Sequence, residues 1–314
     1  ALFMHFTGTI WRPPYEAGSL LLEVTAGCTW HRCKFCTLYD GLPFRFRMTP
    51  PETVEADLRE AQMMAHDPLG KLAALLQGLP EPGGVRRVFL AGANPFALSF
   101  NKLRHIGKLI GQYLPACKTI GCFARVTDVA RKTDRELGTL RDLGYTGLSL
   151  GVETGYAPSL RFMDKGYGPE DIVEQARRLD GAGIGYYFMY LAGLPGAGGG
   201  VRGAAASAAV FNQTHPKIIG SSMLTVFPES RLYQEMQAGN WTEESEVEKL
   251  EEVRTLVERL ETPVWFATLG ASNAVVVQGD LPKDRSALLA KLDAARDPAR
   301  EQALRQYRKS LPHL

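Results

Sequence analysis

Short runs rich in β-forming residues alternate with stretches of helical periodicity along most of this chain. Six such runs occur, at residues 19–25, 86–91, 118–124, 146–151, 184–191 and 217–226. Helix start signals stand between them, as in Thr133-Asp134-Arg135-Glu136. A repeated β-then-α order predicts parallel strands joined by right-handed crossovers. The chain is therefore expected to form either an open doubly wound sheet or a curved partial barrel.

The chain is long enough to bury a sizeable hydrophobic core. It has 314 residues, of which 45% are hydrophobic and 22% charged, and its formal net charge is +2. This balance indicates neither a nucleic-acid partner nor an acidic membrane surface. Residues 1–20 include Arg12, Pro13 and Glu16 where a signal peptide needs an apolar stretch, and no later run approaches about 18 apolar residues. A cytoplasmic location is expected.

The pattern changes after Pro228. The segments that follow read as a long charged helix, an extended segment and a further helical segment, at residues 242–260, 263–279 and 283–310. We therefore expect a main α/β domain with an N-terminal extension at residues 1–228. A C-terminal, mainly helical appendage at residues 229–314 is expected to cover its open side. Residues 68–84, rich in Leu, Gly and Pro, are interpreted as an insertion or a loop with a short helix.

Three of the five cysteines fall within nine residues, on the loop directly after the first predicted strand. They are Cys28, Cys33 and Cys36, in the stretch GCTWHRCKFC. This spacing is too close for a structural disulfide framework and fits reduced thiols. Three thiolates can hold three irons of a four-iron cluster and leave the fourth iron open, whereas a pure electron carrier usually supplies four cysteines. Functional loops of α/β barrels follow the C-terminal ends of strands, where this loop lies.

Two other interpretations of the cysteine loop remain open. His31 as a fourth ligand would give a structural zinc site of the Cys3His kind. Alternatively, the three cysteines could be buried as small hydrophobic residues, although cysteines have no packing reason to crowd into one loop. The other two cysteines, Cys117 and Cys122, lie well apart from the loop in sequence.

The cysteine loop resembles the signature of the radical S-adenosylmethionine (SAM) superfamily. That signature reads Cys-x3-Cys-x2-Cys in most members, with an aromatic residue before the last cysteine, here Phe35. In this chain four residues, not three, separate Cys28 from Cys33. The resemblance extends over residues 12–228 and implies an α/β fold, a partial (βα)6 TIM-like barrel with the C-terminal appendage. It also implies a [4Fe–4S] cluster on the three cysteines, with S-adenosyl-L-methionine bound at the open iron beside Phe35.

Two later segments are similar to SAM-binding segments of the superfamily. Gly92-Ala93-Asn94-Pro95 resembles a Gly-Gly-Glu type turn, and more closely the Gly-Gly-Thr-Pro turn of oxygen-independent coproporphyrinogen III oxidases. Backbone groups of that turn approach the methionine amino group, so a small residue is required. Residues 151–155, Gly-Val-Glu-Thr-Gly, precede Met-Asp-Lys-Gly at 163–166. The resemblance implies that Glu153 bonds the ribose or amino group and that Lys165 pairs with the methionine carboxylate. Apart from the family, Lys165 is equally a solvated charge at a helix end.

Three further residues complete the candidate site. Arg125, near the end of the third strand, is a second candidate for the methionine carboxylate or for substrate. Gly193 follows the fifth strand and resembles the glycine segment that lets the adenine lie against backbone. Cys122 lies inside the third strand and could donate a hydrogen atom to a substrate radical if it faces inward, although such a cysteine more often packs in the core.

The resemblance implies reductive cleavage of SAM to methionine and a 5′-deoxyadenosyl radical, which abstracts hydrogen from an unidentified substrate. A flavodoxin- or ferredoxin-type protein is expected to donate the electron, because the sequence shows no flavin fingerprint and no second cysteine set. Among superfamily members, the segments match best the porphyrinogen oxidases and the tRNA methylthiotransferases, but no RNA-binding module or cobalamin-binding domain is evident. The alternatives are a zinc-stabilised barrel that binds a nucleotide or a partner protein, and a cluster carrier.

Overall fold

The computed structural model describes residues 4–69, 72, 76 and 84–312. Most of the segment interpreted as an insertion, residues 68–84, lies outside the described residues. The chain divides into two compact units. The first comprises residues 1–29, 42–149 and 182–184, and the second comprises residues 30–41, 150–181 and 185–314. The chain passes from the first unit to the second within the cysteine loop, between positions 29 and 30.

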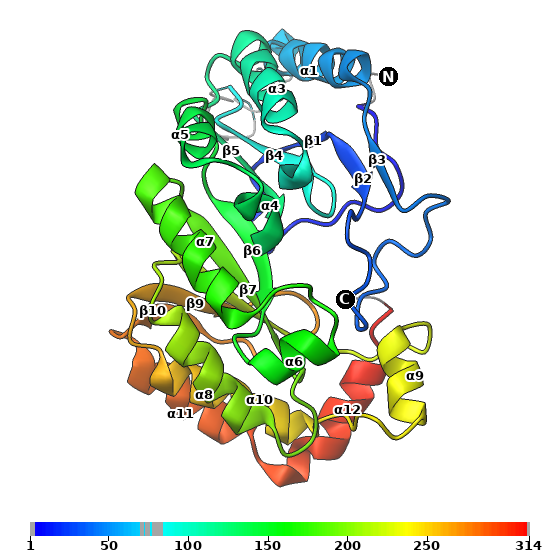
Figure 1. Ribbon diagram of the computed structural model, residues 1–314, viewed down its shortest axis with the longest axis vertical. Helices are drawn as coiled ribbons and strands as arrows, with labels where there is room; N and C mark the ends of the chain where they lie inside the picture. Colours follow the sequence, from blue (N-terminus) through cyan, green and yellow to red (C-terminus); the bar gives the residue numbers. More distant parts are fainter. Residues whose placement is uncertain (1–3, 70–71, 73–75, 77–83, 313–314) are drawn as a thin grey trace. The chain divides into compact units, whose positions relative to one another are not determined.

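The first unit is built on three parallel strands in the order β1-β4-β5. Their bounds are Leu20–Glu23, Arg87–Ala91 and Thr119–Ala124. A two-stranded antiparallel sheet pairs β2 (Thr25–Gly27) with β3 (Phe46–Met48). The helices are α1 (Pro51–Ala65), α3 (Phe100–Tyr113), α4 (Val126–Ala130) and α5 (Asp134–Asp142), with 3-10 turns at Pro14–Glu16 and Pro95–Ala97. Helices α1 and α3 lie side by side (Figure 1).

The local sequence explains these elements of the first unit. Val88, Phe89 and Leu90 of β4 are wholly buried, as expected for a parallel strand covered on both faces. A capping box starts α5, because the Thr133 hydroxyl accepts from the N–H of Glu136 at 3.2 Å and the Glu136 carboxylate accepts from the N–H of Thr133 at 2.9 Å. The predicted β-then-α order with parallel strands is confirmed.

The second unit carries most of the remaining elements. Strand β6 (Leu148–Glu153) begins in the first unit and ends in the second. Strands β7 (Tyr186–Ala192), β8 (Ile218–Met223) and β9 (Val264–Thr268) pair in parallel, and β10 (Gln278–Leu281) is antiparallel to β9. The helices are α6 (Ala157–Phe162), α7 (Pro169–Ala182), α8 (Gly200–Phe211), α9 (Arg231–Gln237), α10 (Glu246–Arg259), α11 (Arg285–Ala295) and α12 (Glu301–Lys309), with a 3-10 turn at Pro298–Arg300. Helix α10 packs on α8 (Figure 1).

Some boundaries differ from the sequence-based prediction. The first predicted strand is two strands, because the chain leaves the parallel sheet after β1 and pairs with β3 as β2. The predicted helix at residues 283–310 is interrupted between α11 and α12, where Pro298 has no N–H to donate. The extended segment at 263–279 forms β9 and the start of β10, so the C-terminal part adds strands beside β8 as well as helices. No helix among the described residues is long and apolar enough to span a bilayer.

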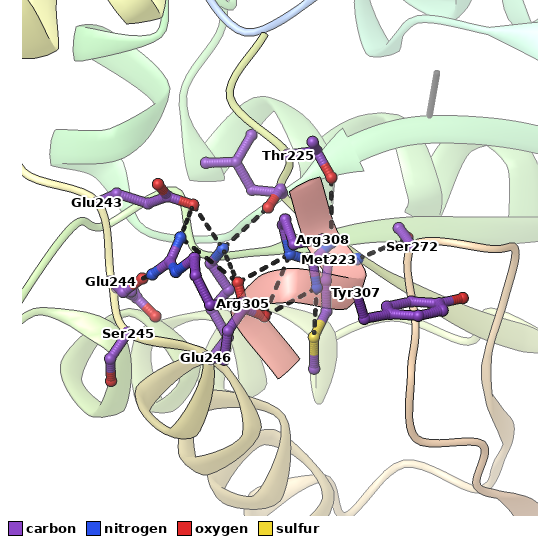
Figure 2. Close-up of polar contacts among 12 residues, drawn as sticks. Met223, Thr225, Glu243, Glu244, Ser245, Glu246, Ser272, Arg305, Tyr307 and Arg308 are labelled. Carbon is purple, nitrogen blue, oxygen red and sulfur yellow. Dashed lines mark hydrogen bonds and ion pairs between the residues drawn. The ribbon is translucent and has the colours of Figure 1, made fainter. Parts of the chain in front are cut away.

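A buried polar network holds the last helix, α12, against the end of β8. The Arg308 guanidinium is almost wholly buried and donates to both carboxylate oxygens of Glu246, at 2.9 and 2.9 Å, and to the Thr225 hydroxyl at 3.0 Å. Arg305 pairs with Glu243 at 2.9 Å. Figure 2 shows these side chains converging from α12, the start of α10 and the segment after β8. These hydrogen bonds and ion pairs hold α12 in one position on the second unit.

Candidate functional site

The Cys28 end of the cysteine loop is fixed by backbone and side-chain hydrogen bonds within the first unit. The N–H of Cys28 donates to the carbonyl oxygen of Arg45 at 2.9 Å. Gly27 has a φ of 79°, and a Cβ there would lie 2.2 Å from the same carbonyl oxygen, so glycine is required. The next residue, Thr29, accepts from Arg45 Nη2 on its carbonyl oxygen at 2.6 Å. Cys28 therefore starts from an ordered backbone.

Asn94, in the predicted SAM-binding turn, contacts the cysteine loop with its side chain. Its Oδ1 accepts from the N–H of Thr29 at 3.2 Å, and its Nδ2 donates to Thr29 Oγ1 at 2.7 Å. The same Nδ2 donates to Asp128 Oδ2 at 3.1 Å. The Asn94 side chain is wholly buried. Sequence analysis missed the partner Asp128, whose only signal was its place shortly after the third strand.

Arg125 lies directly after β5, as predicted, but its backbone has a structural task. Its N–H donates to Asp128 Oδ2 at 2.8 Å at the start of α4, and its guanidinium donates to Thr127 Oγ1 at 3.1 Å. Burial raises the pKa of the Asp128 carboxyl, while the hydrogen bonds from Arg125 and Asn94 oppose the rise. Arg125, Asp128 and Asn94 thus form one buried polar group.

The glycine of the predicted SAM-binding turn has a clear steric reason. Gly92 has a φ of 138°, and a Cβ there would lie 1.9 Å from Thr25 Oγ1. The close neighbour is strand β2, which leads directly into the cysteine loop. Ala93 follows and is partly exposed. Crowding by Thr25 is thus a structural reason for a glycine here, and the approach of the turn to the methionine amino group stays a prediction.

The Cys33–Cys36 end of the loop is held within the second unit. Trp30 Nε1 donates to the carbonyl oxygen of Asp164 at 2.7 Å, and the N–H of Lys34 donates to the carbonyl oxygen of Met163 at 3.1 Å. Gly166 lies under the Trp30 ring: its φ is 80°, and a Cβ would lie 2.5 Å from the ring. A turn in which the N–H of Cys36 donates to the carbonyl oxygen of Cys33 at 3.1 Å shapes the loop itself. Sequence analysis did not identify Trp30 as a site residue, although Gly166, which it contacts, belongs to the segment at 163–166 that was singled out.

Three predicted site residues come together beside this end of the loop. Lys165 Nζ lies 3.4 Å from Glu153 Oε1 and 5.6 Å from the ring centre of Phe35. Tyr167 provides a second ring at 5.6 Å, so the ammonium group is nearly buried among aromatic faces. Phe35 packs in an apolar cluster against which Cys33 and Cys36 also lie. Glu153 has a φ of 63°, a left-handed conformation that a glutamate rarely adopts.

Gly193, after β7, binds a buried glutamate that sequence analysis missed. Its N–H donates to Glu252 Oε2 at 2.8 Å, and the Tyr190 hydroxyl donates to the other oxygen. A second wholly buried carboxyl, Glu244, lies against Glu252. Burial raises the pKa of both carboxyls. The charge of Glu252 raises the pKa of Glu244 further, whereas the hydrogen bond between the two carboxyls lowers the pKa of Glu252. Both glutamates stand in a stretch that reads as charged and therefore exposed, which concealed them.

The thiol of Cys122 lies in the core of the first unit. It is wholly buried in β5, and burial raises its pKa far above the ordinary value of a thiol. Cys117 is partly exposed. The packing role that competes with hydrogen donation is thus compatible with the position of Cys122, and its catalytic role stays a prediction.

The family model of the radical SAM superfamily matches residues 22–197, more than half of the chain. This chain belongs to the radical SAM superfamily. It is therefore an enzyme of the radical SAM type, and its cofactors are those of the superfamily, a [4Fe–4S] cluster and SAM. A search of the curated proteins finds no match.

Solved structures of radical SAM enzymes share the fold. Coproporphyrinogen III oxidase (HemN) from Escherichia coli aligns with a TM-score of 0.54 at 16% identity, over 76% of this chain and 51% of that one. The methyltransferase TsrM from Kitasatospora setae gives 0.51 at 18%, over 68% of this chain and 38% of that one. Methylornithine synthase (PylB) gives 0.50 at 13%, over 92% and 85%. This chain thus spans about half or less of the first two. The likeness confirms the α/β, TIM-like barrel class of fold.

The cysteine loop of this radical SAM protein suits an iron–sulfur cluster by its donor chemistry. Cys28, Cys33 and Cys36 are each partly exposed, so iron and sulfide can reach their sulfur atoms, and thiolates are the usual protein ligands of such clusters. Among the described residues, no three potential ligand side chains already stand close enough to hold one metal ion. His31 Nε2 lies 2.7 Å from Asp40 Oδ1, so the fourth ligand of the zinc alternative is engaged with a carboxylate.

Proposed function

We propose that the protein uses Cys28, Cys33 and Cys36 to hold a [4Fe–4S] cluster and cleaves SAM reductively. The observation that carries this proposal is the family match over residues 22–197, which includes all three cysteines and the strand-end segments at Gly92, Glu153 and Gly193. The bound cluster would supply one electron to the sulfonium, so that one carbon–sulfur bond breaks into methionine and a 5′-deoxyadenosyl radical that takes a hydrogen atom from the substrate.

The residues of the second unit are suited to binding SAM. Lys165 is a nearly buried cation beside Phe35, and in the proposal it binds the methionine carboxylate. Glu153, which has a left-handed backbone and lies 3.4 Å from Lys165, accepts from the ribose hydroxyls or the amino group. Backbone at Gly193 lies against the adenine. Tyr167 holds the strand end by donating to the carbonyl oxygen of Gly151 at 2.6 Å.

The first unit supplies further proposed contacts. Backbone groups of Gly92, Ala93 and Asn94 approach the methionine amino group, while Arg125 stays a candidate for the methionine carboxylate or the substrate carboxylate. Cys122 stays a candidate hydrogen donor. The electron donor is proposed to be a flavodoxin- or ferredoxin-type protein.

The test is a product assay on protein purified and reconstituted without oxygen. Dithionite and SAM are added, and 5′-deoxyadenosine is measured together with iron and sulfide per chain. We expect nearly four irons per chain and product formation, with both lost in the separate variants Cys28→Ala, Cys33→Ala and Cys36→Ala. Cys117→Ala, a partly exposed cysteine outside the loop, is the matched control and should keep both. One zinc per chain and no 5′-deoxyadenosine would overturn the proposal in favour of the Cys3His site with His31.

A further inference from the structure

We propose that Asn94 and Asp128 are positioning residues that order the Cys28 end of the loop before any cofactor binds. This inference rests on the proposed function in one respect, that Cys28 is a cluster ligand. In this inference the Asn94 side chain binds other residues of the protein, and the backbone of the turn binds SAM. The hydrogen bonds of Asn94 reach Thr29, the residue after Cys28, and Asp128 bonds Asn94, so both act through Thr29.

A chain of buried hydrogen bonds leads from the start of α4 to the loop. Asp128 Oδ2 accepts from the N–H of Arg125 at 2.8 Å and from Asn94 Nδ2 at 3.1 Å. Asn94 bonds Thr29 twice: its Oδ1 accepts from the N–H of Thr29 at 3.2 Å, and its Nδ2 donates to Thr29 Oγ1 at 2.7 Å. Both residues are almost wholly buried, so water does not compete for these groups. Thr29 is the residue directly after Cys28.

The hydrogen bonds fix which way the Asn94 amide points. The N–H of Thr29 needs an acceptor, so Oδ1 faces Thr29, and the Asp128 carboxylate needs a donor, so Nδ2 faces Asp128. An aspartate at 94 would accept from Thr29 but would place a second carboxylate against Asp128. A threonine at 94 would lack one of the two groups. Asparagine thus supplies both the acceptor for Thr29 and the donor for Asp128.

The pair can be exchanged without losing its complementarity. In the double variant Asn94→Asp, Asp128→Asn, the new carboxylate accepts from Thr29 and from the new amide. The amide oxygen at 128 takes the place of Oδ2 and still accepts from the N–H of Arg125. The amide nitrogen then takes the place of Oδ1, which lies 3.4 Å from Asn94 Nδ2, and donates from there to the new carboxylate. Asn94→Asp alone brings two carboxylates together in a buried site, which is costly. If Asn94 only filled space, exchanging the two side chains would not restore the order of the loop.

The first experiment uses the protein without cluster. Amide hydrogen exchange of the peptide that contains Cys28 and Thr29 is compared with iodoacetamide modification of each loop cysteine by mass spectrometry. In Asn94→Asp we expect about tenfold faster exchange there and faster modification of Cys28, because the lost hydrogen bonds lower the local opening free energy. Cys33 and Cys36, which are held by the Trp30 end of the loop, should react at the wild-type rate. The double variant should return to within about threefold of wild type.

The second experiment reconstitutes the same variants and counts iron. Asn94→Asp should hold well under half of the wild-type iron, and the double variant should recover most of it. Asn101→Asp, an exposed asparagine on α3, is the matched control and should behave as wild type in both experiments. If Asn94→Asp does not fold by circular dichroism, the double variant decides, and its failure to fold or to protect Cys28 overturns the inference.

The two experiments separate this inference from the proposed function. Wild-type protein that takes up no iron would contradict the proposed function, while exchange and modification in the apoprotein still report on the hydrogen-bond chain. Unchanged exchange and unchanged Cys28 modification in a folded Asn94→Asp variant would overturn the positioning role, even if the wild-type protein carries a full cluster.

Discussion

At the scale of single residues, Glu153 and Lys165 combine strain with burial. Glu153 adopts a left-handed φ of 63°, and the ammonium of Lys165 is nearly buried with Glu153 at 3.4 Å. A carboxylate beside a buried cation offsets part of the desolvation cost of that cation. We therefore expect the ion pair with Lys165 and the left-handed backbone of Glu153 to stabilise each other.

Glu153→Gln should lower the free energy of unfolding of the apoprotein by about 1–3 kcal/mol, because a buried charge loses a charged partner. Lys165→Met should weaken SAM binding, and the loss of stability in the double variant should be smaller than the sum of the two single losses. Urea unfolding monitored by circular dichroism measures the free energies of unfolding of the wild type and the three variants. Additive losses of stability would show that Glu153 and Lys165 do not form a coupled pair.

Some site residues could be predicted from the local sequence pattern and others could not. Phe35, Glu153 and Lys165 stand next to recognisable segments, and the structure brings them together. Asp128 and Glu252 were not predicted, because their partners Asn94 and Gly193 lie 34 and 59 residues away in sequence. Contacts of that range depend on the register of strands and helices, and a single sequence carries no local signal for it.

At the scale of elements, two different turns hold the two ends of the cysteine loop. The turn after β4 holds Thr29 through Asn94, and the turn between α6 and α7 holds Trp30 through Asp164 and Gly166. The strands and helices behind these turns were largely predictable from periodicity and capping residues. The split of the first strand into β1 and β2 was not, because the pairing of β2 with β3 is a tertiary contact.

Gly166→Ala should displace the Trp30 ring, because the new methyl group would lie 2.5 Å from it. Gly198→Ala is the matched control, since Gly198 has a nearly equal φ of 79° and open space at its Cβ. Both variants bear the cost of a left-handed alanine, about 1–3 kcal/mol, but Gly166→Ala should also lower iron uptake and change Trp fluorescence. Equal behaviour of the two variants would exclude a role for the Trp30 contact in ordering the loop.

At the scale of the whole molecule, the buried carboxyls Glu244 and Glu252 make the fold sensitive to pH. No donor among the described residues reaches either oxygen of Glu244, so a negative charge there would receive no hydrogen bond. Burial raises the pKa of both carboxyls above the ordinary 4.5. The folded chain then binds more protons than the unfolded chain. The stabilisation is full below pH 4.5 and is lost as the pH rises through the raised pKa values.

Glu244→Gln should make the free energy of unfolding fall less steeply than in wild type between about pH 5 and about pH 9, since a neutral amide does not titrate. Glu229→Gln, an exposed glutamate, is the matched control and should follow the wild-type curve. Urea unfolding at a series of pH values measures both slopes. Parallel curves for Glu244→Gln and wild type would mean that the buried pair does not hold an extra proton.

In the proposed function, SAM binds to an open iron of a cluster held by three cysteines. Its most direct test is the electron paramagnetic resonance spectrum of the reconstituted, dithionite-reduced protein, recorded with and without SAM. We expect the signal of a reduced [4Fe–4S] cluster whose g values shift when SAM is added, because the methionine group coordinates the fourth iron. The same spectrum with and without SAM, or no cluster signal from a zinc-containing protein, would contradict it.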